Sequence, residues 1–166
     1  MTAVDRAIAI AERGWRVFPC DGKKALVTWQ RNATRNPKAI RQLWRLHPDA
    51  NVGVALPVGT MVLDVDDRAA FAGTGVHLPD APEQATPGGG FHRFYSTNGH
   101  GAAQTVKAIP GADTRVGGKG YVVAWDVGAI PNVGLAADRE ARRVGDFPPA
   151  LVRVVVRLSV GEDEAA

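Results

Sequence analysis

Residues 61–66 read MVLDVD, an apolar run ending in two carboxylates, around which the rest of the chain is expected to fold. Side chains alternate between the two faces of a strand, so Asp64 and Asp66 are expected on one face. Like charges placed side by side repel, and a bound cation removes that repulsion. The pattern therefore indicates a buried strand ending at a site for Mg²⁺ or Mn²⁺, with a solvated turn as the plainer alternative.

The segments around this strand indicate an α+β protein with a largely antiparallel sheet. NVGVAL precedes it across a PVGT turn, so 52–66 is predicted to form a hairpin. FHRFYS (91–96) and GYVVAW (120–125) are predicted strands. Residues 72–90 are rich in Gly, Pro and Thr and predict a loop, whereas 98–112 are too weakly patterned to predict an element.

The N-terminal part predicts two helices flanking a strand. The first helix covers about 3–13, and GWRVFPC then forms a strand that ends at Pro19. A second helix starts at Pro37 and is capped by Asn36. Toward the other end, DFPPALVRVVVRLSV (146–160) favours a helix over a strand.

Length and composition predict one domain over 1–160 followed by a disordered tail over 161–166. The single Cys20 excludes an intramolecular disulfide and any zinc site built from several cysteines. The sequence contains neither an apolar run that could cross a bilayer nor a signal-peptide pattern. A cytoplasmic protein without a membrane partner is expected.

Positive charge is concentrated in the first 50 residues, which carry ten Lys or Arg against four Asp or Glu, while the remainder carries ten against thirteen. Such a cluster attracts a phosphate backbone, although a solvated surface explains it equally well. The candidate nucleic-acid contacts are Lys23, Lys24, Arg31, Arg35, Lys38 and Arg41.

Two further segments carry candidate site residues. His92 follows Gly89 and Gly90, glycines that allow a backbone to approach a ligand and expose its amide groups. A structural histidine is the alternative. Asp113 and Arg115 share a strand face in front of the glycine-rich VGGKG, which suggests a backbone pressed against another group. A surface ion pair is the alternative there, and the lysine of VGGKG is expected to face solvent rather than a phosphate.

These candidates fit a single chemistry. Asp64, Asp66 and Asp113 would hold one or two metal ions that bridge the phosphates of a nucleotide and promote attack by a hydroxyl. His92 and basic side chains would stabilise the triphosphate, and the N-terminal Lys and Arg residues would hold a template strand. The sequence contains no Walker A motif, dinucleotide fingerprint or serine elbow.

The order of motifs resembles the prim-pol domain, the archaeo-eukaryotic primase type of phage and plasmid replication proteins. The resemblance covers about 5–126 and rests on GWRVFPCDGKK, ATRNPKAIRQLW, HPDANVGVAL, VLDVD, TPGGGFHRFY and DTRVGGKGYVVAW. It implies a primase-polymerase core built on an RRM-like sheet with an N-terminal helical unit. It also implies that Asp64 and Asp66 are paired metal ligands.

The resemblance assigns the remaining site residues as well. Asp113 would be the third acid and Arg115 a contact to the incoming nucleotide. His92 would be the nucleotide-binding histidine of a small-x-His motif whose small residue is Gly90, and either Lys23 or Lys24 would fill the family's basic position.

The implied activity is DNA primase or polymerase, acting with NTPs or dNTPs on single-stranded DNA. The chain departs from the family pattern in lacking Pro-Pro-Ser after the last strand and a zinc-binding element. No helicase segment follows in this sequence, so a replicative helicase or a primer-stabilising module is expected on a separate chain. Two alternatives remain: a catalytically weak module that binds nucleotides or single strands, and a metal-dependent nuclease.

Overall fold

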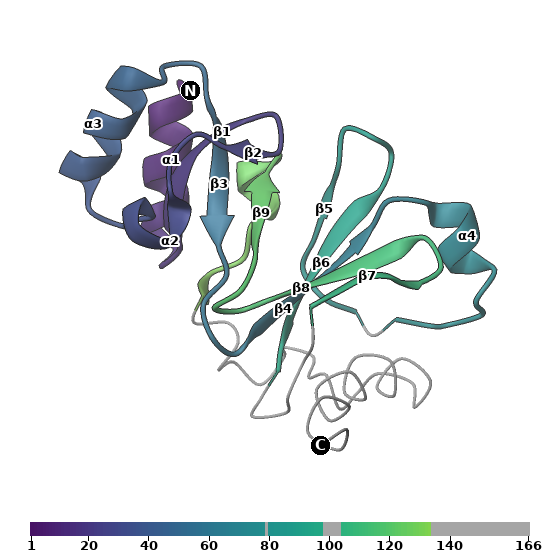
Figure 1. Cartoon of the computed structure of the whole chain (residues 1–166). Coiled ribbons are helices and arrows are strands. Elements are labelled where there is room, and N and C mark those ends of the chain that lie inside the picture. Colours follow the sequence, from purple (N-terminus) through teal and green to yellow (C-terminus); the bar gives the residue numbers. More distant parts are fainter. Residues whose placement is uncertain (79, 98–103, 134–166) are drawn as a thin grey trace.

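A computed structural model describes residues 1–78, 80–97 and 104–133. The described elements form two antiparallel sheets side by side, with helices on the outer side of the first (Figure 1). The predicted α+β class is confirmed. The helices are α1 (Ala3–Glu12), α2 (Trp29–Asn32), α3 (Pro37–Leu46), α4 (Arg68–Ala72) and the 3-10 turn η1 (Val127–Ala129). The strands are β1 (Arg16–Asp21), β2 (Lys24–Ala25), β3 (Asn51–Ala55), β4 (Thr60–Val65), β5 (Glu83–Ala85), β6 (Phe91–Ser96), β7 (Thr105–Ile109), β8 (Ala112–Val116) and β9 (Tyr121–Ala124).

The first sheet has the order β2-β1-β3-β9 and is covered by α1 and α3 (Figure 1). Ile10 of α1 and both Ile40 and Trp44 of α3 are buried in the same core as Val54 of β3. Removing such side chains from water contributes about 25 cal/mol per Å² of apolar surface. This core fixes the first sheet, and with it the turn between β1 and β2.

Both predicted N-terminal helices are confirmed, and both are capped by local side chains. Thr2 Oγ1 accepts the N–H of Asp5, and the Asp5 carboxylate accepts the N–H of Thr2, which forms a capping box at the start of α1. At α3, Asn36 Oδ1 accepts two N–H groups of the first turn, directly before Pro37.

Pro19 does not end the first strand, because β1 continues to Asp21. Val17 exchanges both main-chain hydrogen bonds with Thr34, and the Pro19 carbonyl accepts the N–H of Leu26. The main-chain groups of Pro19 therefore face away from β3. On that side the absence of an N–H costs no hydrogen bond of the β1–β3 ladder.

The hairpin predicted over 52–66 is wrong, because β3 and β4 lie in different sheets. β3 pairs with β1 and β9, whereas β4 pairs with β6 and β8. The links from β3 to β4 and from β8 to β9 run alongside each other, and Leu56 N–H donates to the Gly120 carbonyl. A Cβ on Gly117 would overlap the Pro57 carbonyl oxygen. This glycine thus allows close approach of the neighbouring link.

The second sheet has the order β5-β6-β4-β8-β7. Met61 and Leu63 of β4 are buried on one face together with Phe71 of α4. On the opposite face Val62 and Phe94 belong to the core of the first sheet. The second sheet therefore turns one face toward the first, and β4 contributes to both cores.

Six elements lie where no helix or strand was predicted, namely α2, α4, β2, β5, β7 and η1. Each contains between two and five residues, too few for a hydrophobic period to be visible. The helix predicted over 146–160 and the tail over 161–166 lie outside the described residues, and a single domain over 1–160 stays a prediction. No helix in the described part has both the length and the apolar character to span a membrane.

Candidate active site between the two sheets

Four polar residues form a row across the second sheet. Asp64 on β4 lies opposite His92 on β6 and opposite Asp113 on β8, and His92 in turn lies opposite Gln84 on β5. Residues directly opposite each other on antiparallel strands share a face. The sequence predicted the chemistry of three of these residues, and the pairing makes them neighbours.

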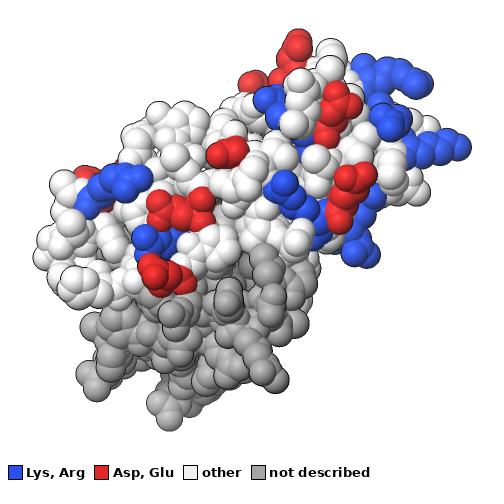
Figure 2. Space-filling view, turned by 180° about the vertical axis from the view of Figure 1, so that it is seen from behind, with Lys and Arg blue, Asp and Glu red and all other residues white. Residues whose placement is uncertain are grey.

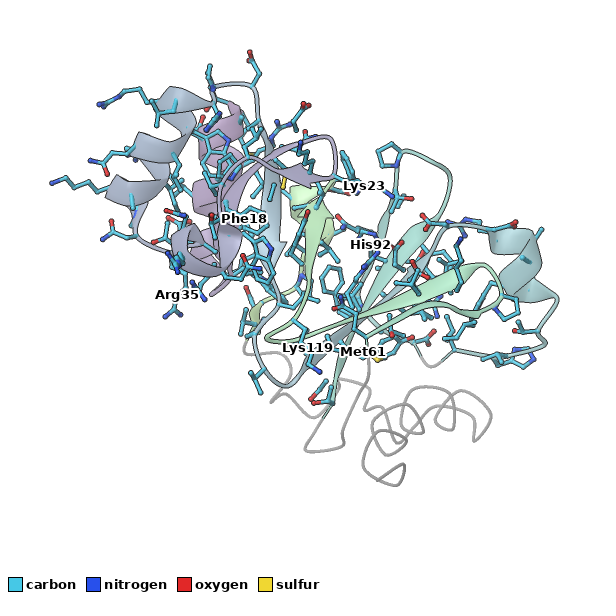
Figure 3. All side chains as sticks on the ribbon, in the orientation of Figure 1. Phe18, Lys23, Arg35, Met61, His92 and Lys119 are labelled. Carbon is cyan, nitrogen blue, oxygen red and sulfur yellow. The ribbon has the colours of Figure 1, made fainter. Side chains whose placement is uncertain are left out.

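A cavity of about 300 Å³ opens between the two sheets beside this row. Figure 3 shows Lys23, His92 and Lys119 along the junction of the sheets. The cavity, here called the inter-sheet cavity, combines two carboxylates, three cationic side chains and three aromatic rings. Its lining residues are Lys23, Trp29, Gln30, Asp64, Asp66, His92, Gln104, Arg115, Lys119, Gly120, Tyr121, Val122, Val123 and Trp125.

Asp64 is a buried carboxylate beside the inter-sheet cavity, and it is 6% exposed. Its Oδ1 lies 3.2 Å from His92 Nε2, yet in the described part of the chain this oxygen has no partner with hydrogen-bond geometry. Burial raises the pKa of Asp64, but the adjacent His92 ring and the charges of Lys23 and Arg115 outweigh burial and hold that pKa below its ordinary value. The site therefore favours an ionised Asp64.

Asp66 lies just beyond the end of β4, where its N–H donates to the Gly111 carbonyl. Its carboxylate lies 3.7 Å from Lys23 Nζ, and both side chains are more than half exposed. Asp67 has a structural role, because its Oδ1 accepts the N–H of Ala70 and caps α4. Asp64 and Asp66 thus face the inter-sheet cavity, whereas Asp67 does not line it.

Asp113 is the neighbour of Asp64 in the row, but its carboxylate does not line the inter-sheet cavity. Oδ1 accepts the main-chain N–H of Lys107 at 2.8 Å, and Oδ2 lies 3.6 Å from an Arg115 nitrogen. An irregular register between β7 and β8, with Lys107 at a φ of 58°, accompanies this contact. Among the described residues no three His, Cys, Asp or Glu side chains are grouped closely enough to hold a metal ion. The three-acid metal site stays a prediction.

The glycines before His92 shape the backbone. A Cβ on Gly90 would overlap the Val65 carbonyl oxygen, so this residue lets the start of β6 approach the end of β4. The Gly89 carbonyl accepts a hydrogen bond from Arg68 Nε at 2.7 Å. Neither glycine is among the residues that line the inter-sheet cavity.

The predicted nucleic-acid contacts are exposed and spread over the N-terminal unit. Figure 2 shows Lys and Arg side chains projecting from the side of the molecule that carries α3. Of the six candidates, only Lys23 lines the inter-sheet cavity. Arg35 lines a second hollow of about 350 Å³, which shares Trp29 and Gln30 with the first.

Several cavity residues were missed by sequence reasoning or were assigned no ligand role. Trp29 and Tyr121 form an edge-to-face pair with ring centroids 5.4 Å apart, and the Tyr121 hydroxyl donates to the Lys23 carbonyl. Lys119, predicted to face solvent, is exposed and also lines the cavity. Gln84, which belongs to the row but not to the cavity lining, had no sequence signal, since a single glutamine in a short strand resembles any surface residue.

The fold and the site together define an α+β protein whose two antiparallel sheets enclose a groove lined by carboxylates and cationic side chains. A family model described as "Bifunctional DNA primase/polymerase, N-terminal" matches residues 7–138, most of the chain. The chain belongs to this Prim-Pol family, which confirms the resemblance found in its motifs. No curated protein matches the chain.

Proposed function

We propose that this protein catalyses template-directed nucleotidyl transfer, as a DNA primase, a DNA polymerase or both. The observation that carries the proposal is the inter-sheet cavity, where Asp64, Asp66 and His92 face the cations Lys23, Arg115 and Lys119. Carboxylates beside several cations suit a ligand that combines phosphates with a divalent metal ion. Membership of the Prim-Pol family supports the same activity.

The donor set fits Mg²⁺ or Mn²⁺. Asp64 Oδ1 is buried without a hydrogen-bond partner among the described residues, and Asp66 offers a second carboxylate at the same cavity. These residues would hold the ion, which when bound polarises phosphate oxygens and lowers the barrier to attack by a hydroxyl. Asp113 is proposed as the third acid. Its carboxylate would give up the hydrogen bond from the Lys107 N–H and bind the ion instead.

The other cavity residues act on the nucleotide, an NTP or a dNTP. Lys23, Arg115 and Lys119 neutralise its phosphates, and Trp29 and Tyr121 offer aromatic faces for a base. Single-stranded DNA is the proposed template, held by the exposed N-terminal Lys and Arg residues. We place the activity in the cytoplasmic replication of phage or plasmid DNA, with a replicative helicase as a proposed partner.

The proposal is tested by primer synthesis and primer extension on single-stranded DNA with Mg²⁺ or Mn²⁺. The variant Asp64→Asn with Asp66→Asn is expected to lose incorporation, because both cavity carboxylates are removed. Asp67→Asn is the matched control, since that carboxylate caps α4 and asparagine is also a good cap. Incorporation that persists in the double variant would overturn the proposed mechanism.

A second candidate is a module that binds nucleotides or single strands without catalysis. The Asp113 carboxylate favours it, because that group already contacts the Lys107 N–H and Arg115. This candidate predicts salt-sensitive binding without incorporation. The nuclease alternative is decided in the same assay, since it predicts shortening of the DNA without added nucleotide.

A further inference from the structure

Gln84 is a buried polar side chain directly behind the site. It is 1% exposed, it belongs to β5 at the edge of the second sheet, and it lies outside the inter-sheet cavity. Its amide crosses to the first sheet, where it contacts main-chain groups of Val123, Trp125 and Asp126. One side chain thus joins the two sheets beside His92.

The orientation of this amide is set by its main-chain partners. Gln84 Oε1 accepts the N–H groups of Trp125 at 3.0 Å and Asp126 at 3.3 Å, and Nε2 donates to the Val123 carbonyl at 2.8 Å. A main-chain N–H only donates and a carbonyl only accepts. Exchanging the amide oxygen and nitrogen would break all three hydrogen bonds, so the placement of Nε2 follows from chemistry.

This orientation decides where the His92 ring carries its proton. Gln84 Nε2 lies 2.8 Å from His92 Nδ1, and an amide nitrogen offers only donors. Nδ1 must therefore accept the hydrogen bond. The proton of the neutral ring then resides on Nε2, the nitrogen 3.2 Å from Asp64 Oδ1.

We propose that Gln84 is a positioning residue, which fixes the tautomer and the orientation of His92 so that an Nε2–H group lies beside Asp64 at the wall of the inter-sheet cavity. His92 then acts as a hydrogen-bond donor to an anionic ligand, and its Nε2 lone pair is not available to a metal ion. The catalytic consequence rests on the proposed function. The tautomer itself rests only on the contacts of Gln84.

The direct test is nitrogen NMR of ¹⁵N-histidine-labelled protein at mildly alkaline pH, where free imidazole is neutral. The His92 signals are assigned by their loss in His92→Asn, since the chain has four histidines. A protonated Nε2 and an unprotonated Nδ1 are expected in the wild-type protein. Protonation of Nδ1 instead would overturn the proposal, whatever the enzymatic activity proves to be.

Two variants test whether Gln84 is the cause. Gln84→Glu places an acceptor at Nδ1 and should move a proton onto that nitrogen. Gln84→Met removes both polar atoms at similar length and should leave a mixture of tautomers. An unchanged Nε2–H tautomer in either folded variant would contradict the proposal. If neither variant folds, the wild-type measurement decides.

A double-mutant cycle distinguishes a positioning role of Gln84 from a purely structural role in joining the two sheets. Gln84→Met is expected to raise the KM for nucleotide by about tenfold with a smaller change in kcat, because the variant no longer orients a hydrogen-bond donor toward a charged ligand. In a His92→Phe background the same substitution should change KM by less than about twofold. If Gln84→Met also raised the KM by the full tenfold in the His92→Phe background, Gln84 would act independently of His92. Absence of incorporation by the wild-type protein would refute the proposed function and leave the NMR result standing.

Discussion

Lys23 and Asp66 lie 3.7 Å apart, Nζ to Oδ1, although they adjoin strands of different sheets. Lys23 lies in the turn between β1 and β2, and Asp66 follows β4. Their approach brings a cation of the first sheet to the carboxylates of the second. The structure thereby distinguishes the two candidate basic residues, since Lys23 lines the inter-sheet cavity and Lys24 does not.

We predict that Lys23→Met weakens nucleotide binding by about fivefold, equivalent to ~1 kcal/mol for a partly solvated charge pair. The matched control Lys24→Met removes the same charge one residue away and should leave the affinity within about twofold. Titration of each variant with a nucleotide and Mn²⁺ measures the effect. Equal reductions of affinity in the two variants would mean that only overall charge matters.

Gly90→Ala is expected to destabilise the protein by roughly 1–3 kcal/mol, because its Cβ would overlap the Val65 carbonyl and push β6 from β4. Gly88→Ala is the control, since a Cβ there meets nothing within 4 Å and its φ is not in the left-handed region. Urea unfolding of both variants measures the difference. If Gly90→Ala were as stable as wild type, this close approach would not constrain the fold.

Cys20 should resist thiol reagents in the folded protein. The side chain is fully buried, and burial raises the pKa of its thiol from 9.0 to about 12. Below pH 9 the thiol is protonated in both the folded and unfolded chain. As pH rises from 9 toward 12, only the unfolded thiol ionises, so stability is lost across that window. Labelling at neutral pH is expected only after denaturation, and rapid labelling of native protein would contradict this burial.

Neutralising the exposed basic residues should weaken binding of single-stranded DNA and flatten its dependence on salt. In a variant with Gln at positions 31, 35, 38 and 41, the slope of log K against log salt should become shallower by about 0.7 for each phosphate that is no longer neutralised. The control is Lys107→Gln, which removes an exposed lysine on β7 and should leave the slope unchanged. An unaltered slope in the quadruple variant would assign the template to another surface.

Local chemistry made much of this fold predictable. Thr2 and Asn36 cap helices because their side chains reach the free N–H groups of the next turn, and neither hydrogen bond depends on the rest of the chain. The alternation of side chains along a strand likewise placed Asp64 on the face opposite Leu63. The ordered motifs indicated the family before any contact was known.

Alternation assigns a face to a residue but does not choose the partner of its strand, because pairing depends on the burial of distant segments. Only the tertiary structure decided that β3 and β4 belong to different sheets and that Asp113 lies opposite Asp64. It also brought Lys23 to Asp66 and Gln84 to His92. The sequence determined which chemical groups the protein contains, and the packing of the two sheets determined which of these groups line one cavity.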